Sequence, residues 1–463
     1  MKVAKFGGTS LASAEQVKKI CDIITADPER RLVVVSAPGK RQADDTKVTD
    51  LLIATARARL QGECGENEGE CGKNEGECGK NELQLVISRY AEIANDLGLP
   101  AAAIEPIADD FQARLELSCD NEGLYMDTMK AGGEDNSARL VAEYLRSIGV
   151  EAHYVNPAEG GMILSDEPGN ARVLKQSYGQ LRTLRERPGI TIFPGFFGYS
   201  ERGQVVTFPR GGSDITGAIL AAAVDAEVYE NFTDVDSVFV ANPHIVDEPV
   251  AVAEITYREM RELSYAGFSV FHDEALEPVF HAGTTVVVKN TNNPTAPGTR
   301  IVPTRSIGQL PVVGIAATDG FCSVYISKYL MNREVGFGRR LLHLFEDEGI
   351  SFEHTPSGID NMSVIVREAT FNRAAEERVL RRIRTELEAD EVSVERGLAL
   401  VMIVGEGMNN TIGIAGRACD AFGEADVNLE MINQGSSEVS MMFGIKAADI
   451  PQAVRSLYKK FFT

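Results

Sequence analysis

The sequence lacks a surplus of basic residues. It contains 46 Lys and Arg against 68 Asp and Glu among 463 residues, and its formal net charge at pH 7 is −22. Proteins that hold nucleic acid through its phosphates present a basic face, so this charge argues against a nucleic-acid partner. It also implies that an anionic ligand must be bound by a few well-placed Lys and Arg side chains.

Long apolar runs are missing as well. No stretch reaches the roughly 18 apolar residues of a membrane-spanning helix. The first residues show neither the apolar segment nor the cleavage site of a signal peptide. We therefore expect no membrane partner and a cytoplasmic location. The length suggests about two to four domains.

The patterns of common metal and nucleophile sites are absent too. The seven cysteines form no C-x-x-C pair and no zinc-ligand spacing, so we expect reduced thiols and assign no metal ligand among the side chains. His272 is interpreted as structural, and the other five histidines form no Ser-His-Asp or H-E-x-x-H pattern. Residues 62–82 carry Cys64, Cys71 and Cys78 in a seven-residue repeat with almost nothing apolar. This segment predicts a solvated surface loop, with a soft-metal or redox role for its cysteines as the alternative.

Strands and helices alternate over residues 1–302. The β-branched run RLVVVSAPGK predicts a buried strand that ends in a loop, between helical patterns at 13–25 and 48–60. The later predictions are helices at 138–150 and 217–226, a strand at 227–235, a strand and turn at 190–199, and a strand followed by a Pro- and Gly-rich turn at 284–302. This order predicts an α/β sheet covered by helices.

The pattern changes after residue 302. The segment PVVGIAATDGFCSVYISK predicts two strands joined by a turn, followed by a helix in VGFGRRLLHLFEDEGI and a strand in SVIVREA. A similar order of strand, helix and two strands recurs over residues 399–445. Two such units in tandem suggest paired small regulatory domains.

The segment KFGGTS follows the first predicted strand. It lacks the G-x-x-x-x-G-K-[ST] spacing of a P-loop. A Gly-Gly turn nevertheless lets backbone N–H groups approach a phosphate, and Lys5 adds a mobile positive charge. Phosphoryl transfer requires positioning and neutralisation of negative charge, so the segment indicates phosphate binding. A turn without a ligand is the alternative.

Three other segments carry polar groups beside strand or helix ends. In FPRGGSD, Arg210 can grip a carboxylate through two parallel bonds, and Asp214 either caps the next helix or organises the reacting groups. In AGGEDNS, Glu134 lies just ahead of a helix and is either a first-turn acid or the counter-charge of a substrate ammonium. In NFTDVDSVF, Thr233 and Asp234 form a strand-end turn or face a nucleotide. Ligands bind at this edge of open parallel sheets.

The ordered segments KFGGTS, AGGE, PRGGSD, FTDVDSVFVANP and VVVKNTNNPTAPGT resemble aspartate kinases of the amino-acid kinase superfamily. The C-terminal units resemble paired ACT domains. The resemblance covers nearly the whole chain outside residues 62–82. It implies a three-layer αβα amino-acid kinase domain at 1–303, followed by two ferredoxin-like ACT units at 310–390 and 396–463.

The resemblance also implies a reaction, in which ATP with Mg²⁺ transfers a phosphoryl group to the side-chain carboxylate of L-aspartate on the route to lysine, threonine and methionine. Lys5 would stabilise the transferring group and Asp214 would organise that lysine. Arg210 would bind the α-carboxylate of aspartate and Glu134 its ammonium, with Thr49 and Ser213 completing the pocket. The nucleotide side would comprise Lys5, Phe6, Gly7, Gly8, Ser36, Thr233, Asp234, Phe239, Asn242 and His244.

Two segments depart from the family pattern. VFVANPH has Phe239, Asn242 and His244 where the family commonly has Tyr, Asp and Arg, and AGFSVFH has Ser269 where many members have Lys. Two cations expected near the nucleotide are therefore missing, and Lys289 is a candidate replacement.

Residues 332–366 resemble the effector-binding unit of lysine-inhibited members. The candidate effector residues are Met331, Gly336, Phe337, Ser357 and Asp360. An ordinary loop before a helix and a type I or II turn are the alternatives. The resemblance implies lysine as the effector, inhibition through two conformational states, and a homodimer formed through the ACT domains.

Two other functions stay open from the sequence. A related kinase could act on a different acid, which the ACT pair and RGGSD argue against. A non-catalytic amino-acid sensor is suggested by the altered VFVANPH segment and opposed by the intact Lys5 and Asp214.

Overall fold

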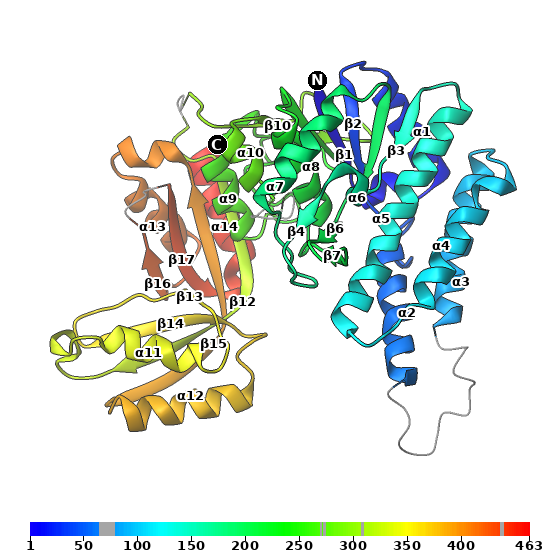
Figure 1. The fold of residues 1–463 in the computed structure, drawn as a ribbon. Helices are drawn as coiled ribbons and strands as arrows, with labels where there is room; N and C mark the ends of the chain where they lie inside the picture. Colours follow the sequence, from blue (N-terminus) through cyan, green and yellow to red (C-terminus); the bar gives the residue numbers. More distant parts are fainter. Residues whose placement is uncertain (64–78, 269–270, 272–274, 307–309, 436–438) are drawn as a thin grey trace. The chain divides into compact units, whose positions relative to one another are not determined.

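The structure is a computed structural model that describes residues 1–63, 79–268, 271, 275–306, 310–435 and 439–463 (Figure 1). It divides into two compact units. The first comprises Met1–Val238, Val252–Tyr257 and Ser269–Arg305, and the second comprises Phe239–Ala251, Arg258–Phe268 and Ser306–Thr463. Cys64, Cys71, Cys78, Ser269 and His272 lie outside the described residues.

An eight-stranded sheet forms the centre of the first unit. Its strands, in spatial order, are β3 (Ala152–Tyr154), β5 (Ile190–Pro194), β2 (Arg30–Val35), β1 (Lys2–Phe6), β8 (Val228–Thr233), β10 (Thr285–Asn290), β11 (Thr299–Val302) and β9 (Glu254–Thr256). Neighbouring strands are parallel except for the antiparallel pair β10 and β11. A second sheet contains β4 (Ile163–Leu164), β6 (Phe197–Ser200) and β7 (Val205–Thr207). The predicted α/β sheet is confirmed.

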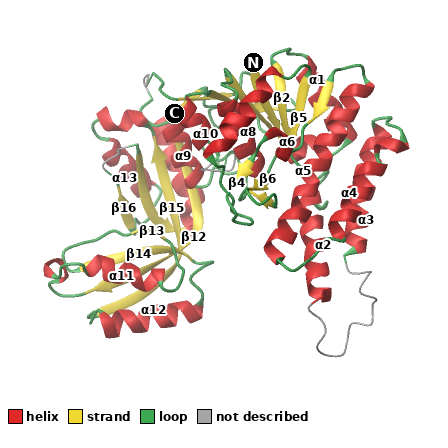
Figure 2. Ribbon diagram, viewed as in Figure 1, coloured by secondary structure: helices red, strands yellow, loops and turns green. Residues whose placement is uncertain are grey.

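Helices flank the strands of the first unit, as Figure 2 shows. They are α1 (Ala14–Thr25), α2 (Val48–Glu63), α3 (Lys80–Asp96), α4 (Glu105–Leu115), α5 (Glu122–Ser147), α6 (Pro157–Gly160), α7 (Lys175–Leu181), α8 (Gly212–Ala223) and α10 (Glu277–Ala282), with short 3₁₀ helices at Gly8–Leu11, Ala101–Ala103 and Arg182–Glu186. On β1, Ala4 and Phe6 enter a buried cluster with α1 to α5. Because side chains alternate along a strand, Lys5 faces the opposite side of the sheet, which α8 covers.

The helix that carries Glu134 is longer than predicted. We expected Glu134 just ahead of a helix at 138–150, but α5 begins at Glu122 and Glu134 lies near its middle. The Gly-Gly pair before it serves close packing, since a Cβ atom at Gly133 would lie 2.8 Å from the Cβ atom of Ala37. These glycines therefore lie inside the helix, where they allow close packing.

The second unit is built on a six-stranded sheet. Its strands, in spatial order, are β13 (Phe352–His354), β14 (Asn361–Arg367), β12 (Gly314–Ser327), β15 (Glu391–Val404), β17 (Ser440–Lys446) and β16 (Met431–Asn433). The prediction of two strands and a turn over 311–328 is wrong, because β12 is one strand with an irregular register between Thr318 and Phe321. The neighbouring strand β15 pairs with β12 on both sides of that irregularity, so the sheet continues through it.

Two hydrophobic cores share these long strands. The helices of the second unit are α9 (Tyr257–Tyr265, whose first residue belongs to the first unit), α11 (Phe337–Glu346), α12 (Arg373–Glu386), α13 (Ile414–Glu424) and α14 (Ile450–Phe462), with 3₁₀ helices at Met331–Arg333, Glu406–Asn410 and Ala447–Asp449. The start of β12 packs with α13 and α14, whereas its end packs with α11 and α12. The order of strand, helix and two strands predicted over residues 399–445 is confirmed. In the first repeat β13 was not predicted, and neither were α12 and α14, each of which follows one repeat. The limits 310–390 and 396–463 remain predictions.

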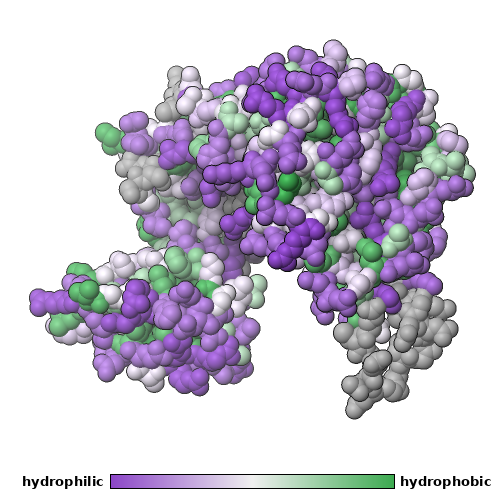
Figure 3. Space-filling model, viewed as in Figure 1, coloured by the Kyte–Doolittle hydropathy of each residue, from purple (hydrophilic) through white to green (hydrophobic). Residues whose placement is uncertain are grey.

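The surface of the second unit exposes several large apolar side chains near α11. Tyr329, Val335 and Ile359 are exposed in the loops beside that helix. Figure 3 shows hydrophobic (green) atoms at the left end of the part of the molecule that contains α11, among mostly hydrophilic (purple) neighbours. Of the helices in the described ranges, none is both long and apolar enough to span a bilayer.

The packing of α8 on β8 leads to the first prediction. A Cβ atom at Gly217 would lie 2.4 Å from the hydroxyl oxygen of Tyr229, which is fully buried. Gly217→Ala should therefore lower the free energy of unfolding by about 1–3 kcal/mol, although Ala favours helices. The measurement is urea unfolding of the full chain.

The matched control is Gly179→Ala on α7, where a Cβ atom meets no neighbour within 4 Å. That change should stabilise the protein by up to about 1 kcal/mol. Equal effects of the two substitutions would contradict the tight contact between α8 and β8.

Candidate active site

Several predicted site residues meet at one edge of the large sheet. The strands β1, β2, β5 and β8 are mutually parallel, so the residues that follow them share one edge. Gly7 and Gly8 follow β1, Ser36 follows β2, and Asp234 follows β8. This edge is where open parallel sheets bind ligands.

Lys5 lies at the centre of this group, on β1. It is only 7% exposed, and its Nζ lies 2.6 Å from Oδ1 of Asp214 in the first turn of α8. Asn231 on β8 pairs in register with Lys5 and donates to the same oxygen through Nδ2 at 2.7 Å. A buried ammonium needs a partner, and here the partner is itself held by a neighbouring strand.

The role of Asp214 as a helix cap is not what the structure shows. The predicted helix at 217–226 begins earlier, at Gly212, and the cap position is Gly211, with φ 81°. Asp214 therefore lies inside the first turn, and its carboxylate pairs with Lys5. Asn231 was not predicted as a site residue, although a polar side chain inside the apolar strand β8 was a usable signal.

The Gly-Gly turn after β1 is closely packed against the loop after β2. Gly39 donates its N–H to the carbonyl of Gly8 at 2.8 Å, and a Cβ atom at Gly39 would lie 2.7 Å from the carbonyl carbon of Gly8. Gly7 donates to the carbonyl of Phe232 on β8 at 3.1 Å. Both loops therefore need glycine for close backbone approach, and the turn is held in one place beside Lys5.

Glu134 is a buried carboxyl group beside these loops. It is 5% exposed, and its Oε2 has no hydrogen-bond partner among the described residues. Burial raises the pKa of Glu134 to about 8, although the backbone of Ala37 favours the ionised form. The carbonyl oxygen of the same residue, Ala37, would be 2.9 Å from a Cβ atom at Gly8, so Glu134 lies near the Gly-Gly turn.

The segment RGGSD lies on the α8 side of the site. A Cβ atom at Gly195, which follows β5, would lie 2.6 Å from Oγ of Ser213, so these two residues are in close contact. Arg210 is exposed and has neither a hydrogen bond nor an ion pair within the described ranges. The structure therefore leaves the Arg210 guanidinium free to bind a ligand.

The other predicted residues divide between the two units. Thr49 lies in the first turn of α2, Phe6 ends β1 and stacks on Phe232 at 4.8 Å, and Thr233 ends β8. Lys289 lies on β10, in register with Phe232. Phe239, Asn242 and His244 belong to the second unit and stay predictions as nucleotide-binding residues.

The five candidate effector residues lie on two adjacent loops of the second unit. Leu330 donates its N–H to Oδ1 of Asp360 at 2.9 Å, and Asn332 donates to the carbonyl of Ile359 at 3.1 Å. Ser357 and Gly336 are exposed on these loops. Met331 and Phe337 are buried in the core with α11, so any effector contact through them has to use their backbone.

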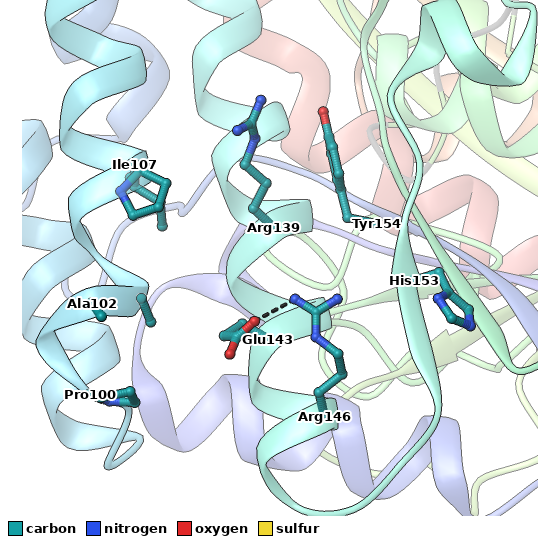
Figure 4. A pocket seen from close by; sticks show the side chains of 10 residues that line it. Pro100, Ala102, Ile107, Arg139, Glu143, Arg146, His153 and Tyr154 are labelled. Atoms are coloured by element: carbon teal, nitrogen blue, oxygen red, sulfur yellow. Dashed lines mark hydrogen bonds and ion pairs between the residues drawn. The ribbon is translucent and has the colours of Figure 1, made fainter.

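A cavity of about 420 Å³ lies elsewhere in the first unit, between α4, α5 and β3 (Figure 4). Its cations are already paired: Arg139 with Asp135, and Arg146 with Glu143. None of the predicted site residues lines it. Across the described ranges, no three His, Cys, Asp or Glu side chains are grouped so as to hold a metal ion.

Comparisons with known proteins agree with this architecture. The amino acid kinase family matches residues 1–290, and an ACT domain family matches residues 401–461. The first match covers more than half of the chain and defines the class, an amino-acid kinase domain joined to an ACT domain.

Individual relatives identify the family more closely. Aspartokinase 3 of Bacillus subtilis is 56% identical over 463 residues, which is 100% of this chain and 99% of that protein. The crystal structure of Clostridium acetobutylicum aspartate kinase is 34% identical, with full coverage of both chains and a TM-score of 0.84. A structure of Escherichia coli aspartokinase III, 24% identical with full coverage of both chains, shares the fold at a TM-score of 0.79.

The chain therefore belongs to the aspartokinase family, as the ordered segments predicted, and it is a kinase. The predicted amino-acid kinase fold with ACT domains is confirmed. A non-catalytic sensor, the alternative suggested by VFVANPH, is not supported.

The raised pKa of Glu134 leads to the second prediction. In the folded protein this carboxyl keeps its proton up to about pH 8, whereas the unfolded carboxyl loses it near 4.5. The free energy of unfolding should therefore fall as the pH rises from about 4.5 to 8. Glu134→Gln has no titratable group at this position. Between about pH 4.5 and 8, its free energy of unfolding should therefore rise relative to that of the wild type by on the order of 3–5 kcal/mol.

The measurement is urea unfolding at pH 5, 7 and 9 without substrates. The control is Glu143→Gln on the same helix, whose side chain is partly exposed and paired with Arg146. It should follow the wild-type pH dependence. A Glu134→Gln variant that also follows it would contradict the buried, protonated state of Glu134.

Proposed function

We propose that this protein transfers the γ-phosphoryl group of ATP to the side-chain carboxylate of L-aspartate. The observation that carries the proposal is the buried pair of Lys5 and Asp214 beside a closely packed Gly-Gly turn, at the ligand-binding edge of a parallel sheet. Membership of the aspartokinase family supports the choice of aspartate as acceptor.

On the nucleotide side, Lys5 has the central role. Its ammonium has three protons, of which one is directed at Asp214, and the others can bind oxygens of the transferring group. Its charge counts for more here than in water because the side chain is buried. Asn231 and Asp214 hold the ammonium in place, so that little reorganisation is needed when charge develops.

The acceptor needs no general base. The side-chain carboxylate of aspartate is already ionised at neutral pH, and one of its oxygens attacks the γ-phosphorus. The new O–P bond forms as the bond between the γ-phosphorus and the β–γ bridging oxygen breaks, and ADP leaves with the bonding electrons. The site therefore has to position two anions and neutralise their repulsion.

The other end of aspartate requires opposite charges. Arg210, which is exposed and unpaired within the described chain, suits the α-carboxylate, and Ser213 and Thr49 are assigned as neutral donors. Glu134 suits the ammonium, because its Oε2 is buried without a partner. An ammonium beside this oxygen favours the ionised carboxylate and so lowers the raised pKa of Glu134.

Mg²⁺ fits this site only as an ion carried by the nucleotide. The described side chains hold no cluster of three metal ligands, but Mg²⁺ in kinases is commonly bound by substrate phosphates and one or two carboxylates. Asp234, exposed after β8, could supply one. When bound, the ion neutralises phosphate charge.

The remaining assignments complete the proposal. Phe6, Gly7, Gly8, Ser36, Thr233 and Asp234 line the nucleotide side, joined by Phe239, Asn242 and His244. The protein acts in the cytoplasm as a homodimer formed through its ACT domains. Lysine acts as an inhibitor at the loops of Met331, Gly336, Phe337, Ser357 and Asp360; a relative, the lysine-sensitive aspartokinase 3 of Escherichia coli, is 26% identical over 99% of both chains.

The role of Lys5 leads to the third prediction. Wild-type protein with Mg-ATP should release ADP only when L-aspartate is added. Lys5→Ala should lower kcat about a thousand-fold or more without unfolding the protein, because it removes the charge that stabilises the transferring group. The measurement is coupled ADP release. The control is Lys2→Ala at the start of the same strand, which removes an ion pair with Asp27 and should leave turnover nearly unchanged. Near-normal turnover of Lys5→Ala would contradict the role assigned to Lys5.

The proposed carboxylate clamp gives the fourth prediction. Arg210→Ala should raise the KM for aspartate about tenfold or more, since a charge-assisted bidentate contact is lost, and should leave the KM for ATP nearly unchanged. Arg202→Ala, an exposed residue paired with Asp166, is the control and should change neither constant. An equal rise of both KM values after Arg210→Ala would rule out the clamp.

The proposed effector site gives the fifth prediction. Added lysine should suppress aspartate-dependent ADP release. Asp360→Ala should raise the lysine concentration for half inhibition about tenfold while keeping kcat, since it removes a charged partner and the bond to Leu330. Asp319→Ala, exposed elsewhere in the second unit, serves as the control. Unchanged lysine inhibition in Asp360→Ala would argue for another effector position.

A further inference from the structure

A buried ionic group outside the residues discussed so far joins two parts of the first unit. Asp127 on α5 is 1% exposed, and its Oδ1 lies 2.7 Å from Nζ of Lys130. Oδ1 also accepts from the hydroxyl of Thr207 at 2.9 Å, while Oδ2 accepts the backbone N–H groups of Thr207 at 2.8 Å and Gly169 at 2.7 Å. Lys130 donates to the Thr207 hydroxyl at 3.1 Å. Every lone-pair direction of this carboxylate thus meets a donor.

Lys130 and Thr207 of this ionic group lie close in sequence to the proposed substrate-binding residues. Lys130 precedes Glu134 by four residues on α5, so the two side chains lie on one face of the helix. Thr207 ends β7 and precedes Arg210 by three residues. The group therefore ties the helix that carries the proposed ammonium-binding carboxylate to the segment that carries the proposed carboxylate-binding guanidinium.

A second contact, through Phe196, also links α5 to the segment that carries Arg210 and Ser213. Nζ of Lys130 lies 5.6 Å from the ring centroid of Phe196, which suits a cation–π interaction. Phe196 has φ 75°, unusual for a side chain of its size, and its N–H is bound by the hydroxyl of Thr216 on α8 at 3.0 Å. A Cβ atom at Gly212 would lie 2.6 Å from the Phe196 ring, so Phe196 is packed on the RGGSD turn.

We propose that Lys130 and Asp127 are positioning residues for L-aspartate, which set the spacing between Glu134 and the pair Arg210 and Ser213. They touch the elements that carry these groups and act through them. An α-amino acid presents its ammonium and α-carboxylate at a fixed separation, so a change in this spacing weakens recognition of that end of the substrate. The nucleotide side, held by the Gly-Gly turn and Lys5, does not depend on these contacts. The inference rests on the proposed function.

The test uses Lys130→Met in the full-length protein, because Met keeps the length and apolar stem and removes the charge. It should raise the KM for aspartate about tenfold, from loss of a charge-assisted bond, and change the KM for ATP less than about twofold. Lys130→Arg, which keeps the charge over Phe196, should restore much of the affinity for aspartate. Lys175→Met, an exposed lysine of the same unit, is the matched control and should match the wild type.

A purely structural role gives a different result. Lys130→Met would then lower the Tm, and any kinetic effect would fall equally on both KM values and not be restored by Lys130→Arg; this overturns the proposal, as does an unchanged KM for aspartate. If Lys130→Met does not fold, Thr207→Val removes only the hydroxyl shared by both partners and should give the same one-sided rise. Wild-type protein without aspartate-dependent turnover would overturn the proposed function and this inference with it, whereas failure of the KM split alone overturns only the inference.

Discussion

The fold of the first unit depends on a lysine placed in a buried strand. An ammonium in the middle of a sheet is costly unless a negative partner faces it, and Asp214 meets Lys5 at 2.6 Å. Asp214 meets this requirement from the first turn of α8. It also explains a polar residue in β8, since Asn231 pairs in register with Lys5 and donates to the same carboxylate. Strand β1 is thereby held to α8 and β8, which follow it by more than 200 residues, at the ligand-binding edge of the sheet.

The second constraint is the charge pattern of the substrates. A chain with a net charge of −22 cannot attract an amino acid with two carboxylates and a nucleotide by its overall field, so local charges have to do so. The candidate site separates them: Lys5 is buried and paired, while among the described residues Arg210 is exposed without a partner and Glu134 is buried with an unsatisfied oxygen. We assign Lys5 to the transferring phosphoryl group, Arg210 to the α-carboxylate of aspartate and Glu134 to its ammonium. The Asp127 and Lys130 pair then links the two elements that bind the amino-acid end.

Much of this could be predicted from the sequence, and the failures have physical causes. Apolar runs predicted β1, β2 and β8, and the residues that follow these strands are the candidates for the site. Glu134 was placed just ahead of a helix and not inside it, because the packing partners of Gly132 and Gly133 cannot be read from the local sequence. The contact of Asp127 with Thr207 spans 80 residues and leaves no local signal. The continuity of β12 depends on β15, a partner more than 60 residues away, which periodicity within one segment does not show.

The most direct test of the central claim is a double-mutant cycle on kcat between Lys5 and Asp214. Lys5→Met, Asp214→Asn and the double variant are compared with the wild type in aspartate-dependent ADP release. If Asp214 acts by holding the Lys5 ammonium, its loss costs little once that ammonium is gone, and the double variant turns over at the rate of Lys5→Met alone. A double variant whose loss equals the product of the two single losses would show that the residues act independently and would contradict the account.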